Sequence, residues 1–296
     1  EELSGTAGKV VTSKGNYGSE MLYTYEKYYD ASDGSSLITT IDSTVQAYVE
    51  KNLQNAIEKY DIKNGAFCIV MDVNTGEIKA MATLGSYDPN NYLEIYDDTT
   101  ALLLENERAA ALALPEASAA YEAAIETYKQ DVAAARMAQW RNRCVSDGYE
   151  PGSTFKLITL ASALDSGAVT LNDSFYCGGQ EKFTGREQIL NCWKSAGHGA
   201  QTTAQALGNS CNIAFGHIGL RMGGDTFYDY LKSFGIMEKT GVDLPGEASG
   251  LFYERKYLND PANYGTSYLI TSSFGQSFRI TPMQLVRAVA AIVNGG

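Results

Sequence analysis

The chain has 296 residues, 44% of them hydrophobic, and a formal net charge of −12 at pH 7. This length and composition suffice to bury a sizeable core. The acidic balance argues against nucleic acid as a partner, because phosphate binding needs clustered Lys and Arg. No apolar run reaches the ~20 residues that span a bilayer, so the sequence predicts no membrane-spanning segment here.

The N-terminal third begins with a segment rich in Gly, Ser and Tyr, residues 1–36, which we expect to be extended or loosely ordered. Asp42 can cap a helix that runs to about Lys59, because apolar residues recur there at three- and four-residue steps. Residues 66–72 and 77–83 then predict two strands joined by an Asn-Thr-Gly turn. Together they would form the first hairpin of a sheet.

Residues 93–144 form a segment with a predicted long helix from Pro115 to about Trp140. Apolar residues repeat at helical spacing along it, and most charged residues fall outside that stripe. One interpretation is a wall or lid beside a substrate groove. The other is an insertion helix that packs on the domain without a role in chemistry.

The tetrad Ser153-Thr-Phe-Lys156 follows a turn predicted at Pro151-Gly152 and opens a helix expected to end near Gly167. A hydroxyl and an amine three residues apart can face each other across one helical turn. Free N–H groups at a helix start stabilise negative charge on the serine oxygen. A partly desolvated Lys156 can lose its proton and act as the base that a serine nucleophile requires. The pattern therefore predicts acyl transfer through a serine ester.

A second motif, Ser210-Cys-Asn212, lies at a plausible distance along the chain. Ser-x-x-Lys alone is weak, and an ordinary surface serine and lysine would explain it equally well. The combination of Ser-x-x-Lys with Ser-x-Asn is typical of serine β-lactamases and penicillin-binding proteins. We expect Ser210 and Asn212 in the connection between two helices over residues 200–222, the first of them capped by Thr202 or Thr203. Further helices are predicted at Asp225 to Phe234 and Thr281 to Asn294, the last of the chain.

The cysteines and histidines show no paired zinc-type spacing, so the sequence predicts no metal site. Cys177 and Cys192 flank a segment that could fold as a looped excursion. They form a disulfide in an oxidising exterior or remain two free thiols, and both readings stay open. His198 is expected to shape a loop, and His217 to pack on a helix.

Longer segments resemble class B penicillin-binding proteins, in the family's order from about residue 37 to 296. The active-serine segment is similar at Tyr149 to Lys156, and the second-motif segment at Asn209 to Phe215. The other similar segments are Ile38 to Asp42 with Val45-Gln46, Asp72 to Ala80, Thr240 to Glu247, Gly275-Gln276 and Thr281 to Gln284.

The resemblance implies an α/β (α+β) transpeptidase fold shared with serine β-lactamases, in which helices pack an antiparallel sheet beside a helical subdomain. Residues 1–36 would be a linker from the N-terminal pedestal, and residues 37–296 a transpeptidase domain with a helical insertion at about 93–144. Family members carry an N-terminal membrane anchor, so we expect Glu1 to be a boundary within a longer protein at the extracytoplasmic face of the cell membrane.

The implied reaction is D,D-transpeptidation of peptidoglycan stem peptides without a cofactor. Lys156 would deprotonate Ser153, Ser210 would relay a proton to the leaving amine, and Asn212 would bind the substrate backbone. β-Lactam antibiotics would acylate Ser153, and other cell-wall synthesis proteins would be partners. Alternatives are a β-lactamase or β-lactam sensor of the same fold, and a scaffold without turnover.

The triplet Lys239-Thr-Gly241 spells the family's third motif, but it precedes a segment that family members carry away from the cleft. We interpret it as a loop after a helix. The strand that carries the true motif is expected beyond Gly296, so the resemblance implies a domain that is incomplete at its C-terminal end.

Overall fold

The computed structural model describes residues 3–11, 27–63, 65–83, 85–116, 118–260 and 265–296. Their contacts divide the chain into two units, residues 1–40 and residues 41–296. In the first unit, β1 (Lys9–Val11) pairs antiparallel with β2 (Lys27–Tyr29). The expectation of an extended segment fits these strands, and the part of it that falls on residues 1–2 and 12–26 lies outside the described residues.

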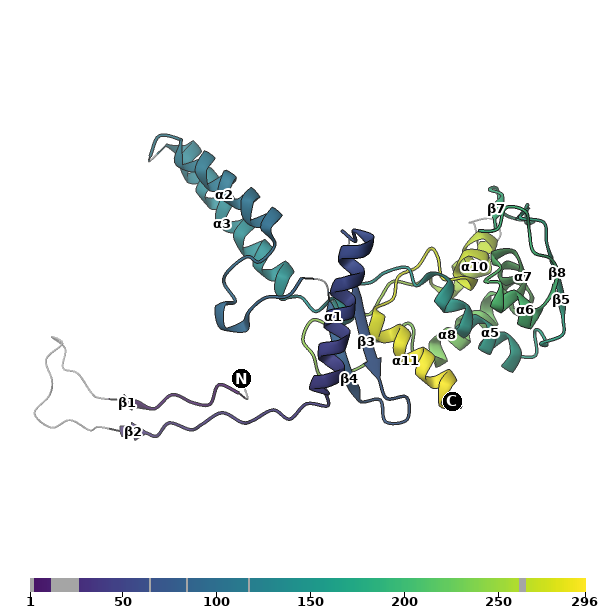
Figure 1. The fold of residues 1–296 in the computed structure, drawn as a ribbon, viewed down its shortest axis with the longest axis horizontal. Coiled ribbons are helices and arrows are strands. Elements are labelled where there is room, and N and C mark those ends of the chain that lie inside the picture. The colour runs from purple at the N-terminus through teal and green to yellow at the C-terminus, as the bar shows by residue number, and fades with distance from the viewer. Residues whose placement is uncertain (1–2, 12–26, 64, 84, 117, 261–264) are drawn as a thin grey trace, which may run out of the picture. The chain divides into compact units, whose positions relative to one another are not determined.

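The second unit begins with α1 (Ser43–Tyr60), followed by the hairpin of β3 (Phe67–Met71) and β4 (Ile78–Thr83) (Figure 1). Asp42 accepts hydrogen bonds from the Thr44 and Val45 N–H groups, which confirms the predicted cap. Gln46 attaches the helix to the hairpin: its side chain donates to the Met81 carbonyl and accepts from the Met81 N–H. The two predicted strands are confirmed.

The described residues between Pro89 and Ser146 are mainly helical. The elements are η1 (Pro89–Asn91), α2 (Asp98–Leu112), α3 (Ala119–Trp140) and α4 (Arg143–Ser146). The expected helix start at Pro115 was wrong, because the Ser118 hydroxyl caps the helix by accepting from the Tyr121 N–H. α2 and α3 pack against each other as a helical hairpin. The helix α2 was not predicted from the sequence.

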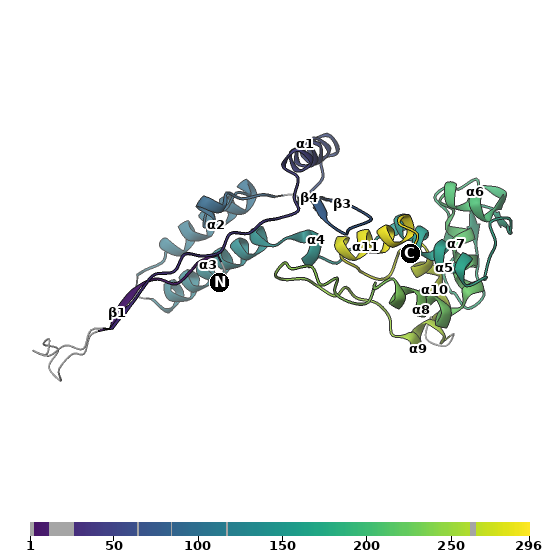
Figure 2. The same ribbon diagram turned by 90° about the horizontal axis from the view of Figure 1, so that it is seen from below.

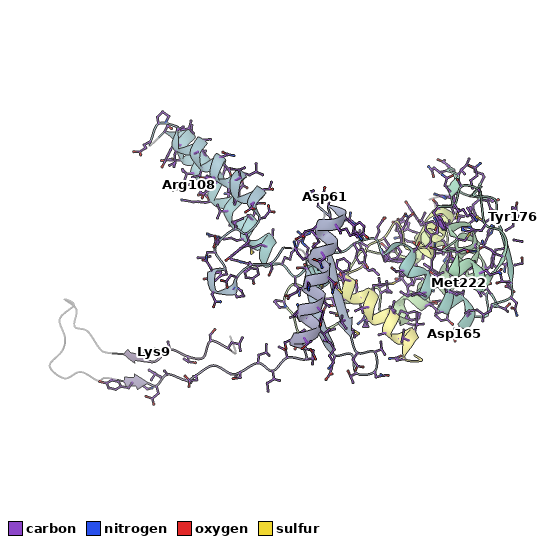
Figure 3. The ribbon with its side chains drawn as sticks, in the orientation of Figure 1. Lys9, Asp61, Arg108, Asp165, Tyr176 and Met222 are labelled. Carbon is purple, nitrogen blue, oxygen red and sulfur yellow. The ribbon has the colours of Figure 1, made fainter. Side chains whose placement is uncertain are left out.

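The remaining elements form a mainly helical region (Figure 2). In chain order they are η2 (Gly152–Phe155), α5 (Lys156–Asp165), β5 (Ser174–Cys177), β6 (Gln180–Glu181), β7 (Leu190–Asn191), β8 (Gly199–Thr202), α6 (Thr203–Gly208), α7 (Asn212–Met222), α8 (Gly224–Ser233), α9 (Arg255–Leu258), α10 (Gly265–Ser273) and α11 (Pro282–Val293). The predicted helices at 225–234 and 281–294 are confirmed as α8 and α11. Asp165 and Met222, labelled in Figure 3, mark the C-terminal ends of α5 and α7.

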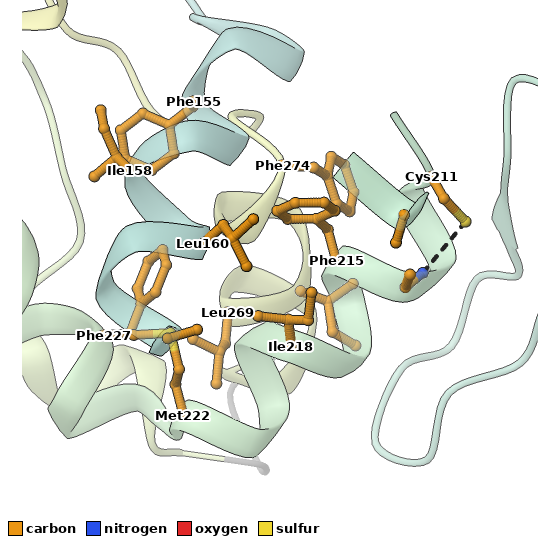
Figure 4. Packing of buried hydrophobic residues seen from close by; sticks show 14 of the residues in the cluster. Phe155, Ile158, Leu160, Cys211, Phe215, Ile218, Met222, Phe227, Leu269 and Phe274 are labelled. Carbon is orange, nitrogen blue, oxygen red and sulfur yellow. Dashed lines mark hydrogen bonds between the residues drawn. The ribbon is translucent and has the colours of Figure 1, made fainter. Parts of the chain in front are cut away.

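The main core lies between α5, α7, α8 and α10 (Figure 4). Its large side chains are fully or almost fully buried, and they include Phe155, Ile158, Leu160, Phe215, Ile218, Met222, Phe227, Leu269 and Phe274. A smaller cluster of Cys144, Val145 and Met283 joins α4 and α11 to the hairpin of β3 and β4. Burial of this apolar surface is the main contribution to the free energy that holds α5 against α7.

No helix within the described residues combines the length and apolarity needed to cross a bilayer.

Candidate active site

Ser153 lies in the first helical turn after the Pro151-Gly152 turn. η2 continues directly into α5, and the Thr154 hydroxyl donates to the Pro151 carbonyl at 2.7 Å. Gly152 takes a φ of +58°, a left-handed conformation that suits glycine. Gly167, also left-handed at φ +71°, follows the last turn of α5, as predicted. The Ser153 side chain is exposed, whereas Lys156 is fully buried.

The residues just before Ser153 are held in place by a segment much further along the chain. Tyr149 forms an antiparallel bridge with Ile280, and the Gly152 N–H donates to the Gly275 carbonyl at 2.8 Å. Just inside η2, the rings of Phe155 and Phe278 meet edge to face with centroids 4.8 Å apart. The active-serine turn therefore rests on residues 275–280, which include the Gly-Gln segment singled out in the sequence.

Lys156 is the centre of the site. Its Nζ lies 3.1 Å from Ser153 Oγ, 3.0 Å from Ser210 Oγ, 2.8 Å from the Ser210 carbonyl oxygen and 2.7 Å from Asn212 Oδ1. The structure thus brings together all four residues that the two motifs predicted. Ser153 lies in η2 and Lys156 is the first residue of α5, whereas Ser210 lies between α6 and α7 and Asn212 is the first residue of α7.

The four contacts of Lys156 can accommodate a neutral amine. The Ser210 carbonyl and Asn212 Oδ1 can only accept, so they take the two N–H bonds of a neutral amine. The lone pair that remains can accept a proton from a hydroxyl, and Ser153 and Ser210 both present one within reach. The arrangement therefore presents a base to Ser153.

Burial lowers the pKa of Lys156 to about 8, because a charged ammonium loses its hydration there. The neighbouring thiols of Cys192 and Cys211 act in the opposite direction. With a pKa of about 8, about a tenth of the lysine is neutral at pH 7, against roughly one part in three thousand at the ordinary value of 10.5. Desolvation thus supplies enough free base for proton transfer near neutral pH.

Ser210 adopts a left-handed backbone conformation with φ +49°, uncommon for a residue other than glycine. Its N–H donates to the Leu207 carbonyl, and the Cys211 N–H donates to the Ala206 carbonyl, so the end of α6 holds the turn. The conformation lets both the carbonyl and the hydroxyl of Ser210 face Lys156. Strained positions of this kind persist only where the surrounding structure holds them.

The triplet Lys239-Thr-Gly241 has a different role. The N–H groups of Thr240 and Gly241 and the Thr240 hydroxyl all donate to the Glu247 carboxylate. The Lys239 carbonyl accepts from Arg287 on α11. These bonds close a loop after α8, as the sequence analysis expected, and none of them involves Ser153 or Lys156.

Four residues that the sequence analysis had set aside lie together next to this site. The sulfurs of Cys177, Cys192 and Cys211 and a ring nitrogen of His198 are all within 4.8 Å of one another. All five cysteines of the chain are free thiols. These residues have no paired zinc-type spacing in the sequence, but the pairing of β5 with β8 brings residues together that are far apart along the chain. His217, by contrast, packs on Phe183 and pairs with Glu181.

A signal for this cluster was present in the sequence. Three of the five cysteines and one of the two histidines fall within residues 177–211. No pair among them has the short spacing of a zinc finger, and a search for short spacings misses ligands supplied by separate strands.

The chain matches the family described as the penicillin binding protein transpeptidase domain over residues 66–296. Stage V sporulation protein D of Bacillus subtilis is 33% identical over 297 residues, which cover 100% of this chain and 38% of that protein. Peptidoglycan D,D-transpeptidase FtsI of Escherichia coli K12 is 27% identical over 304 residues, covering 99% of this chain and 41% of the relative. The chain thus spans about two fifths of the length of these relatives.

A solved structure described as a peptidoglycan synthetase from Bifidobacterium adolescentis shares the fold. Its TM-score is 0.67 at 26% identity, and the match covers 98% of this chain and 43% of that one. A peptidoglycan glycosyltransferase from Burkholderia ambifaria matches with a TM-score of 0.62 at 25% identity, over 88% of this chain and 62% of that one. The α+β fold predicted from the sequence is confirmed.

Proposed function

The chain belongs to the penicillin-binding protein transpeptidase family, and from its site we propose that the protein is a serine D,D-transpeptidase that cross-links peptidoglycan stem peptides. The observation that carries the proposal is the contact of a fully buried Lys156 with Ser153 Oγ at 3.1 Å. A buried amine whose pKa is lowered to about 8 can serve as the general base that activates an exposed serine.

In the proposed first step, the lone pair of Lys156 accepts the Ser153 proton as Oγ attacks the carbonyl of the penultimate D-alanine. The backbone N–H of Ser153, in the first turn of a helical segment, is one donor to the developing oxyanion. The proton then passes to the departing amine of the terminal D-alanine through Ser210, whose Oγ is 3.0 Å from Lys156 Nζ. The product is an ester on Ser153.

In the second step, the amine of a neighbouring stem peptide attacks this ester. The same groups work in reverse, since Ser210 and Lys156 accept the proton of the attacking amine and return one to Ser153 Oγ. The new amide is the cross-link. Asn212 holds Lys156 at 2.7 Å through Oδ1, which leaves its amide NH₂ for the carbonyl groups of an extended substrate.

A β-lactam would acylate Ser153 in the same way, so labelling with a fluorescent penicillin tests the proposal. We expect one labelled band from the full-length protein and none from Ser153→Ala. The labelled peptide should carry the added mass on Ser153. Labelling that survives Ser153→Ala would overturn the nucleophile assignment.

The same experiment separates the other readings of the site. Rapid release of hydrolysed drug would indicate a β-lactamase, and a long-lived adduct without formation of dimeric stem peptides would indicate a sensor. No labelling of a correctly folded protein would indicate a scaffold. We further propose that the site works at the extracytoplasmic face of the cell membrane, where peptidoglycan is assembled, alongside other cell-wall synthesis proteins.

A further inference from the structure

The cluster of Cys177, Cys192, His198 and Cys211, called here the Cys3His cluster, lies beside the active site without a part in the proposed reaction. The three cysteines are 1%, 6% and 0% exposed. Cys192 Sγ is 3.7 Å from His198 Nδ1, and all four ligand atoms lie within 4.8 Å of one another. The Nε2 atom of His198 is buried and has no hydrogen-bond partner among the described residues. The rings of Trp193 and His198 meet edge to face, with their centroids 5.4 Å apart.

The fold explains the convergence of these four residues. β5 pairs with β8 so that Cys177 lies opposite Gly199, which places the adjacent His198 next to Cys177. The short antiparallel pair of β6 and β7 then brings Cys192 back to the segment that follows β5. There the Cys192 N–H donates to the Gly179 carbonyl at 2.8 Å. Cys211 is the N-cap of α7. Tyr176, labelled in Figure 3, is 70% exposed on β5, so the strand alternation turns the neighbouring Cys177 inward.

We propose that the Cys3His cluster is a structural zinc site. Three thiolates and one imidazole form a complete tetrahedral set for Zn²⁺, and soft sulfur ligands exclude Mg²⁺ and Ca²⁺. With Zn–S bonds of about 2.3 Å, tetrahedral ligand atoms are about 3.6–3.8 Å apart. The 3.7 Å between Cys192 Sγ and His198 Nδ1 already has this value. The other pairs, within 4.8 Å, require a movement of about 1 Å or less.

A backbone amide already donates to one sulfur of the cluster. The backbone N–H of Ala214 donates to Cys211 Sγ, a bond drawn in Figure 4. Hydrogen bonds from backbone amides stabilise negative charge on sulfur, and such outer contacts orient the ligands of metal sites. With four protein ligands the site has no open position, so its role is structural.

The zinc site would hold the second active-site motif in place. Cys211 separates Ser210 from Asn212, and both neighbours contact Lys156. Ser210 has a left-handed backbone, so its conformation needs support from outside the turn. A metal bond at Cys211 would anchor the turn to β5 and β8, which are part of a different segment of the chain. This positioning role rests on the proposed function, whereas the presence of the site does not.

The first test is metal content. The full-length protein, purified under reducing conditions without chelator, should contain about one zinc ion per chain. The zinc-free protein should bind one Co²⁺ and develop the visible absorption of tetrahedral cobalt with thiolate ligands. Cys177→Ser and His198→Ala should lose both signals, and Cys68→Ser, on β3 outside the cluster, should keep both.

His198→Cys provides a matched variant, because four cysteines also form a tetrahedral zinc site. It should retain one zinc ion and shift the cobalt spectrum toward that of four sulfur ligands. This retention separates ligation from a merely destabilising effect of changes at position 198. A reduced, folded protein that takes up neither Zn²⁺ nor Co²⁺ would overturn the proposal. So would a disulfide among the three cysteines that reforms in the presence of excess Zn²⁺.

The positioning role has its own readout. Removal of zinc from the wild-type protein should slow acylation of Ser153 by penicillin at least ~10-fold, and added Zn²⁺ should restore the rate. The His198→Cys variant should be acylated at close to the wild-type rate, and His198→Ala should not. A zinc-binding protein whose acylation rate does not change on metal removal would retain the site and lose the positioning role. A protein that binds zinc and is never acylated would contradict the proposed function alone.

Discussion

The Gly152 N–H donates to the Gly275 carbonyl at 2.8 Å, and the two glycines lie so close that a Cβ on Gly275 would overlap the Gly152 backbone. Gly275 also has a φ of +84°, in the left-handed region that favours glycine. This contact joins the segment before α11 to the turn that presents Ser153. The position of Ser153 therefore depends on a residue more than a hundred positions away in sequence.

Replacing Gly275 by Ala should displace the Ser153 turn. The strained φ and the overlap together should lower the free energy of unfolding by about 2–4 kcal/mol and slow penicillin acylation at least ~10-fold. Gly76→Ala is the matched control, since Gly76 has a φ of +77° and open space around it. The control should lose only about 1 kcal/mol and acylate normally. Equal acylation rates in the two variants would contradict the role of the contact.

The rate of acylation should rise with pH through the pKa of Lys156. Burial lowers that pKa to about 8, and only the neutral amine can accept the Ser153 proton. The second-order rate constant for penicillin should therefore rise about tenfold per pH unit below pH 7 and level off above pH 9. Stopped-flow measurements from pH 6 to 10 provide the check. A flat profile across this range would rule out Lys156 as the rate-determining base.

Asn212→Asp should move this profile upward. The change places a carboxylate at the position of Oδ1, now 2.7 Å from Lys156 Nζ, and a nearby negative charge favours the ammonium form. We expect the midpoint to rise by about 1–3 pH units and the rate at pH 7.5 to fall at least ~10-fold. Asn52→Asp, on the exposed surface of α1, adds the same charge and should leave the profile unchanged.

Gln284 should contribute strongly to stability, because it is fully buried and its Nε2 donates to the carbonyls of Ile236, Glu238 and Ser249. Gln284→Leu would leave these carbonyls without that donor. The free energy of unfolding in urea should fall by about 2–4 kcal/mol. Gln54→Leu on α1, where the side chain is exposed, should change it by less than about 0.5 kcal/mol. A small effect at Gln284 would show that water replaces the amide.

Local signals predicted the hairpin of β3 and β4 and the helices α1, α3, α5 to α8 and α11, but none of the short strands β5 to β8 and neither α9 nor α10. Asp42 and Thr281 each cap a helix with side-chain hydrogen bonds, and a short Asn-Thr-Gly turn joins β3 to β4. α2 escaped prediction because its apolar residues do not form a single stripe: Leu102 and Leu103, adjacent in the helix, are 59% and 65% exposed. Its stability comes from packing on α3, which a periodicity argument does not detect.

In the candidate site, too, some contacts follow from local sequence and others depend on how distant segments pack. Ser153 and Lys156 are three residues apart, so helical geometry alone brings them together. The contact of Lys156 with Ser210 and Asn212 depends on packing between α5 and α7, and the sequence pointed to it only through a motif. The Cys3His cluster depends on the pairing of β5 with β8, which no local pattern specifies.

In its neutral form Lys156 has one lone pair, and the hydroxyls of both Ser153 and Ser210 lie within reach of it. Because both N–H bonds are committed to acceptors that cannot donate, the amine can exchange a proton with only one hydroxyl at a time. Whichever hydroxyl has given up its proton, the other stays poised for the return transfer. In the proposed reaction, the two half-reactions would then differ only in the direction of proton flow, and the site would be ready for its next donor peptide without moving a side chain.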